Sequence, residues 1–241
     1  MRLPARSPPA ADCRLPSAVP TADCRLPTAS IRLVIFDCDG VLADADSSWE
    51  YVHRAFGTDN NTSLLAYLQG EFDDWEFIRR DVRLWTKGTE KVPASRIRAI
   101  LDKIPMMTGA AQTVSALKAR GIKTAIVSAG MNMLTERIAL RTGVEINLSN
   151  GILVDGDGFL TGEGFVNVPV NDKGSAVRKL IAELGFKKSE CAAVGDRGID
   201  CGMFEHVGLR IAFNPADEEV CDNADVVIRE KDLREILKYM L

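Results

Sequence analysis

The sequence predicts an α/β fold built on a doubly wound parallel sheet with helices on both faces. From Ile31 onward, short apolar runs alternate with amphipathic helical patterns, and several of the apolar runs end in acidic or hydroxyl side chains. A β-hairpin and an inserted helical cap interrupt the alternation. Because ligands collect at the carboxyl ends of the strands in such a sheet, the polar side chains at those ends are the first candidates for a site.

The strands are expected where apolar runs are short and lack alternation, since strands of a parallel sheet are buried on both faces. The helices are expected where apolar residues recur at spacings of three and four. Glycine follows three of these helices as a stop signal. The expected strands are residues 31–36, 123–128, 191–196, 209–213 and 224–228, and the expected helices are 110–121, 133–143, 173–185 and 232–241.

Two segments depart from the alternation. Residues 151–169 contain Asp-Gly twice between extended runs, which predicts a β-hairpin beside the sheet. Residues 44–107 are helical in pattern and hold eight of the fifteen aromatic residues, most of which we expect to fill the segment's own core. Because it follows the first strand, this segment is expected to be a cap that covers the site and excludes water, and residues 31–43 and 108–241 are expected to form the catalytic core.

Composition excludes several classes of partner. The 241 residues have a formal net charge of −4, so we expect no nucleic-acid partner. The sequence contains no run of 18 apolar residues, so we expect no membrane-spanning segment. The six cysteines form no CxxC pair, which fits a reducing cytoplasm. Residues 1–30 contain most of the prolines and two copies of ADCRLP, which predicts a disordered extension. The oligomeric state stays open.

Polar residues recur where the predicted strands end and helices begin. Taken singly, each has an ordinary explanation, such as a turn, a helix cap or a solvated first-turn residue. Taken together, and in this order along a parallel sheet, they are expected to converge on one site. They are Asp37 and Asp39 after the first strand, Ser128 after the second, Lys173 at a helix start, and Asp196 and Asp200 after the run CAAVG.

These residues also lie in stretches with a family resemblance. DCDGV, VSAG, DKGSA and VGDRGID resemble the four motifs of the haloacid dehalogenase-like phosphohydrolases, over a region from Ile31 to the C-terminus. The hairpin and the segments around the second and fourth motifs are similar to the phosphoserine phosphatase branch. The resemblance implies the Rossmann-like core of that family and a phosphatase that acts through an aspartyl-phosphate intermediate.

The resemblance also implies roles for individual residues. Asp37 would be the nucleophile, and Asp39 would protonate the leaving alkoxide and then accept a proton from the attacking water. The Ser128 hydroxyl, the Ala129 amide and the Lys173 ammonium would hold the phosphoryl group.

The same resemblance implies a cation. Mg²⁺ would be held by the Asp37 side chain, the Asp39 backbone carbonyl, Asp196 and water, an oxygen-rich set suited to that ion. Asp200 would orient Lys173 or a water on the metal.

The resemblance specifies the reaction more closely than the substrate. The resemblance implies a small phosphorylated metabolite, with Asp46 receiving the amino group of phosphoserine. Asp81 replaces the family's carboxylate-binding arginine, and Arg80 is the neighbouring candidate for that contact. Gly40-Val41 and Ile199 also differ from the phosphoserine phosphatase pattern, which keeps phosphoglycolate or a sugar phosphate as alternatives.

Three other readings compete with a phosphatase. A phospho-receiver domain uses similar residues around magnesium, but it has no helical insert, and here the third strand candidate, near EINLSN, ends in no aspartate. A nucleotide-binding dehydrogenase needs G-x-G-x-x-G after the first strand, and DCDGVL lacks it. An inactive member acting as a phosphate-binding or signalling protein is disfavoured because every charged motif residue is present.

Overall fold

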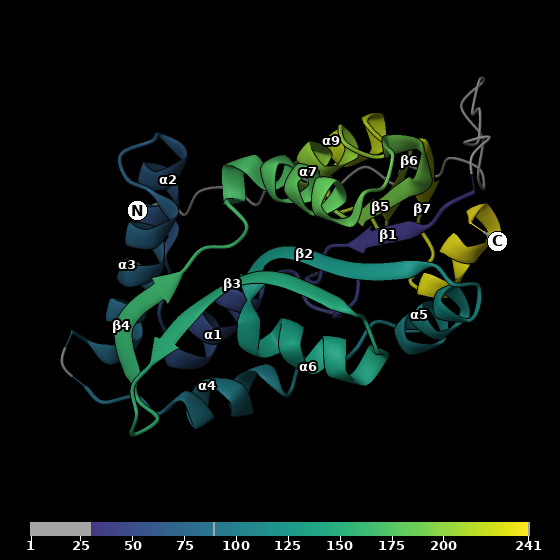
Figure 1. Ribbon diagram of the computed structural model, residues 1–241. Helices are drawn as coiled ribbons and strands as arrows, with labels where there is room; N and C mark the ends of the chain where they lie inside the picture. Colours follow the sequence, from purple (N-terminus) through teal and green to yellow (C-terminus); the bar gives the residue numbers. More distant parts are fainter. Residues whose placement is uncertain (1–29, 89, 241) are drawn as a thin grey trace, which may run out of the picture.

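The computed structural model describes residues 30–88 and 90–240, and it contains a seven-stranded sheet with helices on both faces (Figure 1). The strand order is β4-β3-β2-β1-β5-β6-β7. All neighbouring pairs are parallel except β3 and β4. The strands are β1 (Leu33–Phe36), β2 (Lys123–Met131), β3 (Ile146–Val154), β4 (Leu160–Phe165), β5 (Cys191–Gly195), β6 (Leu209–Phe213) and β7 (Val226–Ile228).

The predicted doubly wound sheet is therefore confirmed, and each of the five predicted parallel strands is present. The disordered extension predicted for residues 1–30 lies outside the described residues, apart from Ser30. No helix among the described residues is long and apolar enough to cross a membrane.

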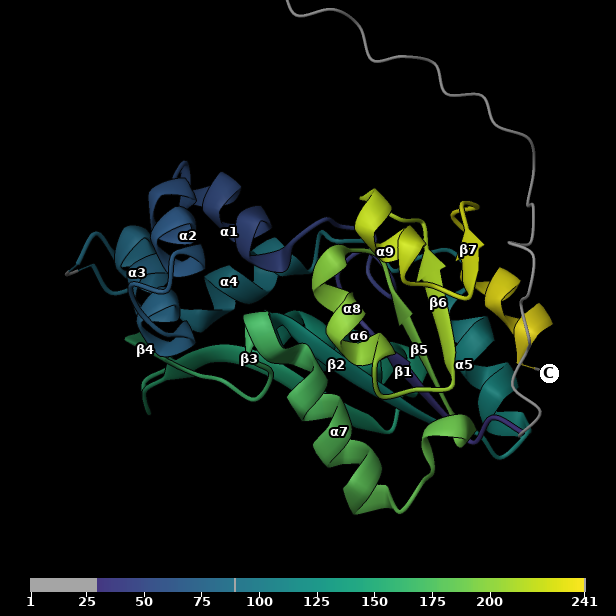
Figure 2. The ribbon, with the colours of Figure 1, turned by 90° about the horizontal axis from the view of Figure 1, so that it is seen from above.

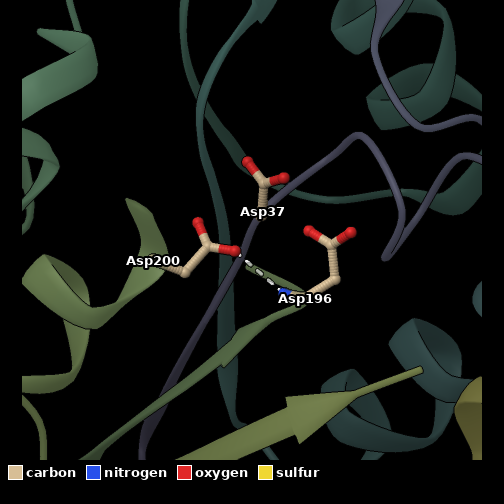
Figure 3. Close-up of side chains that lie close together, drawn as sticks. All are labelled: Asp37, Asp196 and Asp200. Carbon is tan, nitrogen blue, oxygen red and sulfur yellow. Dashed lines mark hydrogen bonds between the residues drawn. The ribbon is translucent and has the colours of Figure 1, made fainter. Parts of the chain in front are cut away.

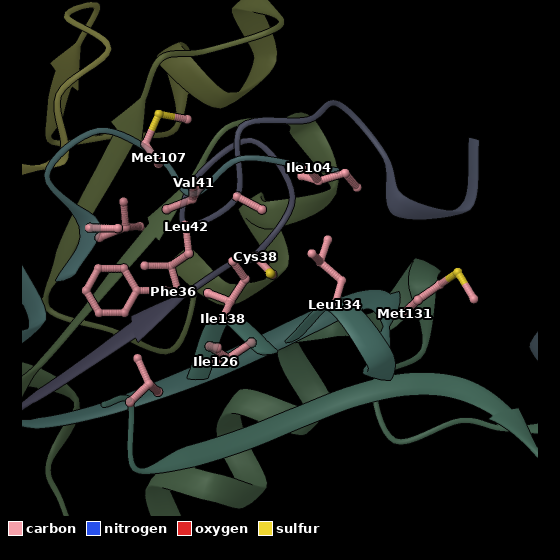
Figure 4. Packing of buried hydrophobic residues seen from close by; sticks show 14 of the residues in the cluster. Phe36, Cys38, Val41, Leu42, Ile104, Met107, Ile126, Met131, Leu134 and Ile138 are labelled. Atoms are coloured by element: carbon pink, nitrogen blue, oxygen red, sulfur yellow. The ribbon is translucent and has the colours of Figure 1, made fainter. Parts of the chain in front are cut away.

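All four residues of the central strand β1 are buried. Its side chains point alternately to opposite faces of the sheet, so both faces of the strand are covered. Val34 and Phe36 join the hydrophobic cluster on one face (Figure 4), and Leu33 and Ile35 join the cluster on the other. This explains why the strand reads as an unbroken apolar run rather than an alternating one.

Helices cover both faces of the sheet (Figures 1 and 2). On one face, α5 (Ala110–Ala119) and α6 (Asn132–Thr142) contribute residues to the cluster around Phe36. On the other face, α7 (Lys173–Leu184) and α8 (Cys201–Phe204) pack with α9 (Glu218–Asp222). Short 3₁₀ helices connect these elements: η1 (Val170–Asp172), η2 (Lys188–Glu190), η3 (Gly198–Asp200) and η4 (Leu233–Tyr239).

The helix predicted for residues 232–241 is the 3₁₀ helix η4 rather than an α-helix. Leu233 and Ile236 are both fully buried, and residues three apart lie in line on a 3₁₀ helix. The tighter winding therefore places both side chains in the core beside α5.

The predicted hairpin is present, but its first strand begins earlier than expected. One continuous strand, β3, pairs in parallel with β2 up to Asn150 and then antiparallel with β4 from Gly151. Asp155 stabilises the turn, because its Oδ1 accepts hydrogen bonds from the backbone N–H groups of Asp157 and Phe159.

Residues 44–107, here called the helical insert, lie at one side of the sheet (Figure 1). They form α1 (Ser48–Phe56), α2 (Asn61–Leu68), α3 (Asp74–Thr86) and α4 (Ala94–Leu101). The segments that enter and leave the insert lie side by side. Met107 N–H donates to the Leu42 carbonyl at 2.9 Å, and Asp44 N–H donates to the Pro105 carbonyl at 2.9 Å. The insert therefore starts and ends beside the carboxyl end of β1.

Candidate active site

Three carboxylates meet at the carboxyl ends of β1 and β5 (Figure 3). Asp37 directly follows β1, Asp196 directly follows β5, and Asp200 ends η3. One oxygen from each carboxylate lies within 4.8 Å of the others, and all three residues are buried. The structure thus brings together residues that are up to 163 positions apart in the sequence, counting from Asp37 to Asp200. We call these three residues the acid cluster.

The loop after β1 comes close to the acid cluster because residue 40 is a glycine. Gly40 has φ of +80°, and a Cβ atom there would lie 2.2 Å from Oδ2 of Asp196. Any other side chain would be strained and would collide with the carboxylate. On the opposite side, Asp196 N–H donates to Oδ2 of Asp200 at 2.8 Å, which ties the two acids together.

Lys173 is the buried cation of the site. It is the first residue of α7, and its Nζ donates to Oδ1 of Asp37 and to Oδ1 of Asp200, at 2.6 Å in both cases. The residue is only 1% exposed. A buried ammonium group is tolerated when carboxylates pair with it, so the three side chains hold one another in place.

The charges of the acid cluster are not fully compensated by Lys173. Burial raises the pKa of Asp37 to about 7, with Asp200 and Asp39 adding to the rise and Lys173 opposing it. Burial together with Asp200 and Asp37 raises the pKa of Asp196 to about 8. Burial by itself lowers the pKa of Lys173, but the attraction of Asp200 and Asp37 is stronger and leaves the pKa of Lys173 above its usual value. The cluster therefore favours additional positive charge.

The side chain of Asp39 is hydrogen-bonded to the start of α1. Its Oδ2 accepts hydrogen bonds from the backbone N–H and the hydroxyl of Ser48, both at 2.7 Å. Burial raises the pKa of Asp39, and the Ser48 hydrogen bonds partly offset that rise. The first helix of the insert is therefore attached directly to a predicted site residue.

Ser48 also reaches β2, where the predicted phosphate-binding residues lie. Its hydroxyl accepts from Met131 N–H at 2.9 Å, and the neighbouring Trp49 donates its Nε1–H to the Ala129 carbonyl at 3.0 Å. Ser128 is 1% exposed, and its Oγ accepts from Gly130 N–H.

The oxygens of Asp39, Ser48 and Ser128 converge around Gly130. A Cβ on Gly130 would lie 2.9 Å from Asp39 Oδ2, 3.0 Å from Ser48 Oγ and 3.1 Å from Ser128 Oγ. The site therefore has two adjoining parts, the acid cluster with Lys173 and this group of oxygens around Gly130.

The acid cluster fits a divalent cation. Its donors are carboxylate oxygens, the ligands that Mg²⁺ prefers, and Oδ1 of Asp196 is buried without a hydrogen-bond partner. Asp200, which was expected only to orient Lys173 or a water on the metal, lies among the candidate ligands. The Asp39 side chain lies outside the cluster, and the expectation that its backbone carbonyl binds the ion stays a prediction.

The residues predicted to contact the rest of the substrate lie apart from the acid cluster. The Asp46 side chain is 85% exposed, and its Oδ1 lies 3.6 Å from Nη2 of Arg197. Arg80 contacts other residues of the insert, since it pairs with Glu76 and stacks 3.9 Å over the Phe72 ring.

Asp81, which occupies the position expected for an arginine, is buried inside the insert. Its Oδ1 lies 3.2 Å from Nε2 of His53, and Asn60 donates to both of its oxygens. Trp85 donates its Nε1–H to Nδ1 of His53. These polar contacts lie inside the insert, so the acid at this position has hydrogen-bond donors around it there.

Ser48 and Arg197 contact the site although neither was among the residues expected there. Ser48 is one of two adjacent serines, and nothing in the pattern distinguishes the one that reaches Asp39 from Ser47, which caps α1 through Glu50 N–H. Arg197 had a visible signal, because it is a charged residue next to Asp196 within the motif VGDRGID.

Comparisons with known proteins agree with this geometry. A family model described as haloacid dehalogenase-like hydrolase matches residues 31–208. Phosphoserine phosphatase of Methanocaldococcus jannaschii is 31% identical over 213 residues, which cover 87% of this chain and 97% of that protein. Phosphoserine phosphatase of Wolinella succinogenes is 30% identical over 212 residues, covering 87% of this chain and all of that protein.

Solved structures show the same fold. The apo form of a phosphoserine phosphatase superposes with a TM-score of 0.74 at 28% identity, covering 88% of this chain and all of that chain. A phospho-aspartyl intermediate analogue of phosphoserine phosphatase superposes with a TM-score of 0.73 at 29% identity, with the same coverage.

Proposed function

Since the chain belongs to the haloacid dehalogenase-like hydrolases, we propose that it is a magnesium-dependent phosphatase that hydrolyses a small phosphate monoester through an aspartyl-phosphate intermediate. The observation that carries the proposal is the buried contact of Lys173 with Asp37 at 2.6 Å, next to Asp196 and Asp200. A carboxylate nucleophile facing a phosphate dianion needs compensating positive charge, and this arrangement supplies it.

Asp37 is the proposed nucleophile. Its carboxylate oxygen attacks the phosphorus atom, and the bond between phosphorus and the ester oxygen breaks as the aspartyl phosphate forms. Lys173 stabilises the negative charge on the phosphoryl oxygens, and the Ser128 hydroxyl and the Ala129 N–H hydrogen-bond to the same group. Asp200 keeps Lys173 in position through its own 2.6 Å contact.

Asp39 is the proposed general acid and base. It gives its proton to the departing ester oxygen, which leaves as an alcohol, and then accepts a proton from the water that attacks the aspartyl phosphate. That second attack breaks the bond between phosphorus and the Asp37 oxygen and releases inorganic phosphate. The raised pKa of Asp39 supports this role, because the residue must carry a proton to act first as an acid.

The metal would be held by the carboxylates of Asp37 and Asp196, with the Asp39 backbone carbonyl and the neighbouring Asp200 completing the protein's share. When bound, Mg²⁺ supplies positive charge that neutralises the phosphoryl oxygens. The uncompensated charge of the acid cluster supports this assignment.

Phosphoserine is the first substrate to test. The support is the similarity to phosphoserine phosphatases over 87% of the chain. In this proposal Asp46 is the receptor for the substrate's ammonium group. Residues 44–107 act as the cap in this proposal, and residues 31–43 and 108–241 form the core. The position of Ser48 and Trp49 against Asp39 and Ala129 supports a cap that closes on the site.

A cytoplasmic location belongs to the same proposal, and the free thiols of Cys38, Cys191, Cys201 and Cys221 support it.

The test is turnover of p-nitrophenyl phosphate with and without MgCl₂, followed by a panel of phosphoserine, phosphoglycolate and sugar phosphates. We expect activity that depends on Mg²⁺ and is abolished in Asp37→Asn. Asp44→Asn is the matched control, since Asp44 lies in the same loop but pairs with Lys231. Activity retained by Asp37→Asn, or lost equally in Asp44→Asn, would contradict the proposed nucleophile.

A further inference from the structure

Arg197 lies at the rim of the site, between the acid cluster and the start of the helical insert. Its Nε donates to Oδ2 of Asp196 at 3.2 Å, and its Nη2 lies 3.6 Å from Oδ1 of Asp46. The side chain is 33% exposed. One edge of the guanidinium group is therefore held by buried Asp196, and the other edge lies beside the exposed side chain of Asp46.

Arg197 differs from Lys173, the other cation that contacts the acid cluster in the described part of the chain. Both hydrogen bonds of Lys173 go to buried carboxylates, and the residue is 1% exposed. Among the described residues, Nη1 and Nη2 of Arg197 have no hydrogen-bond partner, because the contact with Asp46 is too long for one. Arg197 thus has N–H groups available for an anion that enters the site.

Two of the three arginines of α3 are engaged elsewhere, and the third, Arg83, is 65% exposed with its Nη1 3.9 Å from Oε1 of Glu76. Arg79 donates to Glu163 on β4 at 2.6 Å, and Arg80 pairs with Glu76 and stacks on the Phe72 ring. These contacts hold the insert together and attach it to the hairpin, and none of them involves the acid cluster. Arg80, the expected carboxylate receptor, is therefore engaged within the insert, whereas Arg197 contacts the acid cluster itself.

From this arrangement we infer that Arg197 is the receptor for a carboxylate on the leaving group of the substrate, working beside Asp46 as receptor for an ammonium group. The inference rests on the phosphatase function proposed above and names the residue that would bind the carboxylate of an amino-acid phosphate ester. An α-amino acid carries its ammonium and carboxylate on the same carbon, so its receptor needs an anion and a cation side by side. Arg197 and Asp46 form such a pair, and a guanidinium group binds a carboxylate through two parallel hydrogen bonds.

The experiment compares three esters that separate the two charges. Phosphoserine carries both groups, phosphoethanolamine carries only the ammonium, and phosphoglycolate carries only the carboxylate. For Arg197→Ala we expect kcat/KM for phosphoserine and phosphoglycolate to fall by about tenfold or more relative to phosphoethanolamine, the usual scale for a lost charged hydrogen bond. For Asp46→Asn we expect the opposite pattern, with phosphoserine and phosphoethanolamine affected relative to phosphoglycolate.

A binding measurement provides a readout that does not depend on turnover. Isothermal titration calorimetry of phosphoserine and of phosphoethanolamine against Asp37→Asn, with and without Arg197→Ala, should show about tenfold weaker binding of phosphoserine only. Arg54→Ala is the matched control, because it removes a cation from the insert that is 69% exposed and paired with Glu50. It should leave the ratio between the esters as in the parent protein.

Three outcomes would overturn the inference. Equal losses for all three esters would show that Arg197 acts on the phosphoryl group or on Asp196. A selective loss in Arg80→Ala without one in Arg197→Ala would place the carboxylate receptor on α3. A parent protein that hydrolyses p-nitrophenyl phosphate but does not prefer carboxylate-bearing esters over phosphoethanolamine would refute the substrate class. Absence of any Mg²⁺-dependent turnover would instead refute the proposed function, and calorimetry would then decide the role of Arg197 alone.

Discussion

Nζ of Lys173 lies 2.6 Å from Oδ1 of Asp37, although the two residues are separated by 136 positions in the sequence. The contact exists because α7 begins at the edge of the sheet where β1 ends, so the first residue of the helix reaches the residue that follows the strand. Asp200 receives a second bond of the same length from Lys173, which restrains the ammonium group from both sides.

Replacing Lys173 by methionine should lower kcat for phosphoserine or p-nitrophenyl phosphate by about a hundredfold or more, the scale of losing one preorganised electrostatic contact. The physical reason is that Asp37 and the phosphoryl group would then face each other without the buried positive charge. Steady-state kinetics with circular dichroism to check folding would measure this. Lys179→Met is the control, since Lys179 lies on the same helix with an 80% exposed side chain. A folded Lys173→Met protein with full activity would contradict the role.

Replacing Ser48 by alanine should lower both stability and activity. The change removes a hydrogen bond to Asp39 and leaves the buried Met131 N–H without its acceptor, which costs about 1–3 kcal/mol of unfolding free energy. The hydrogen bonds from Ser48 lower the pKa of Asp39, so losing one of them should raise that pKa. Asp39 would then keep its proton to higher pH, and the alkaline limb of the kcat/KM profile should move to higher pH.

Urea denaturation and a pH–rate profile would measure these two effects. Ser47→Ala is the neighbouring control, because Ser47 caps α1 without touching the site. It should lower stability by about 1 kcal/mol with no shift of the pH profile. A pH profile that is identical in Ser48→Ala and the parent would refute the link to Asp39.

Replacing Asp39 by asparagine should lower the rate for phosphoserine by roughly a hundredfold or more, the usual scale of general acid–base help. The loss should be smaller for p-nitrophenyl phosphate, since a nitrophenolate leaves readily without a proton whereas an alkoxide does not. Comparing kcat for the two substrates tests the first of the two proton transfers. Equal losses for both substrates would show that Asp39 does not act as the acid.

Magnesium should stabilise the protein more at pH 8 than at pH 5. The pKa values of Asp37 and Asp196 are raised in the folded protein from 3.8 to about 7 and about 8. In the absence of a divalent cation, their contribution to stability is therefore complete below pH 3.8 and is lost as the pH rises to about 8. A metal ion binds the deprotonated carboxylates and should restore stability where protons no longer do.

Calorimetric melting in EDTA and in MgCl₂ at several pH values measures this dependence. We expect the rise in Tm produced by MgCl₂ to increase with pH, reaching about 5 °C or more at pH 8 with saturating metal. In Asp196→Asn the rise should be small at every pH. A rise that does not change between pH 5 and pH 8 would contradict binding at the acid cluster.

Asp81 should matter for stability rather than for substrate choice. Asp81→Ala removes the partner of buried His53 and Asn60, which should lower the unfolding free energy by about 3 kcal/mol. Glu71→Ala, at an exposed position in the same insert, should change it by about 0.5 kcal/mol. If Asp81→Ala altered the ratio of kcat/KM for phosphoserine over phosphoethanolamine, Asp81 would have to contact the substrate.

The parallel core and most of the candidate site could be predicted because their signals are local. An apolar run buried on both faces followed by an acid identifies both a strand and its carboxyl end, and parallel strands bring those ends together. Asp37, Lys173, Asp196 and Asp200 therefore meet as expected. The contacts of Arg80 and Asp81 could not be predicted, because they depend on which face of α3 packs inside the insert.

The alternation of strands and helices, the position of the insert after β1 and the charged side chains at the strand ends can all be read from the order of residues. Periodicity and burial are properties of short segments, so the order of residues is enough to specify them. Two contacts became visible only in the folded chain: Ser48 rather than Ser47 holds Asp39, and Arg197 lies between Asp196 and Asp46. Those contacts join segments that are distant in the chain, and their distances follow from the packing of the insert against the sheet, which no local pattern encodes.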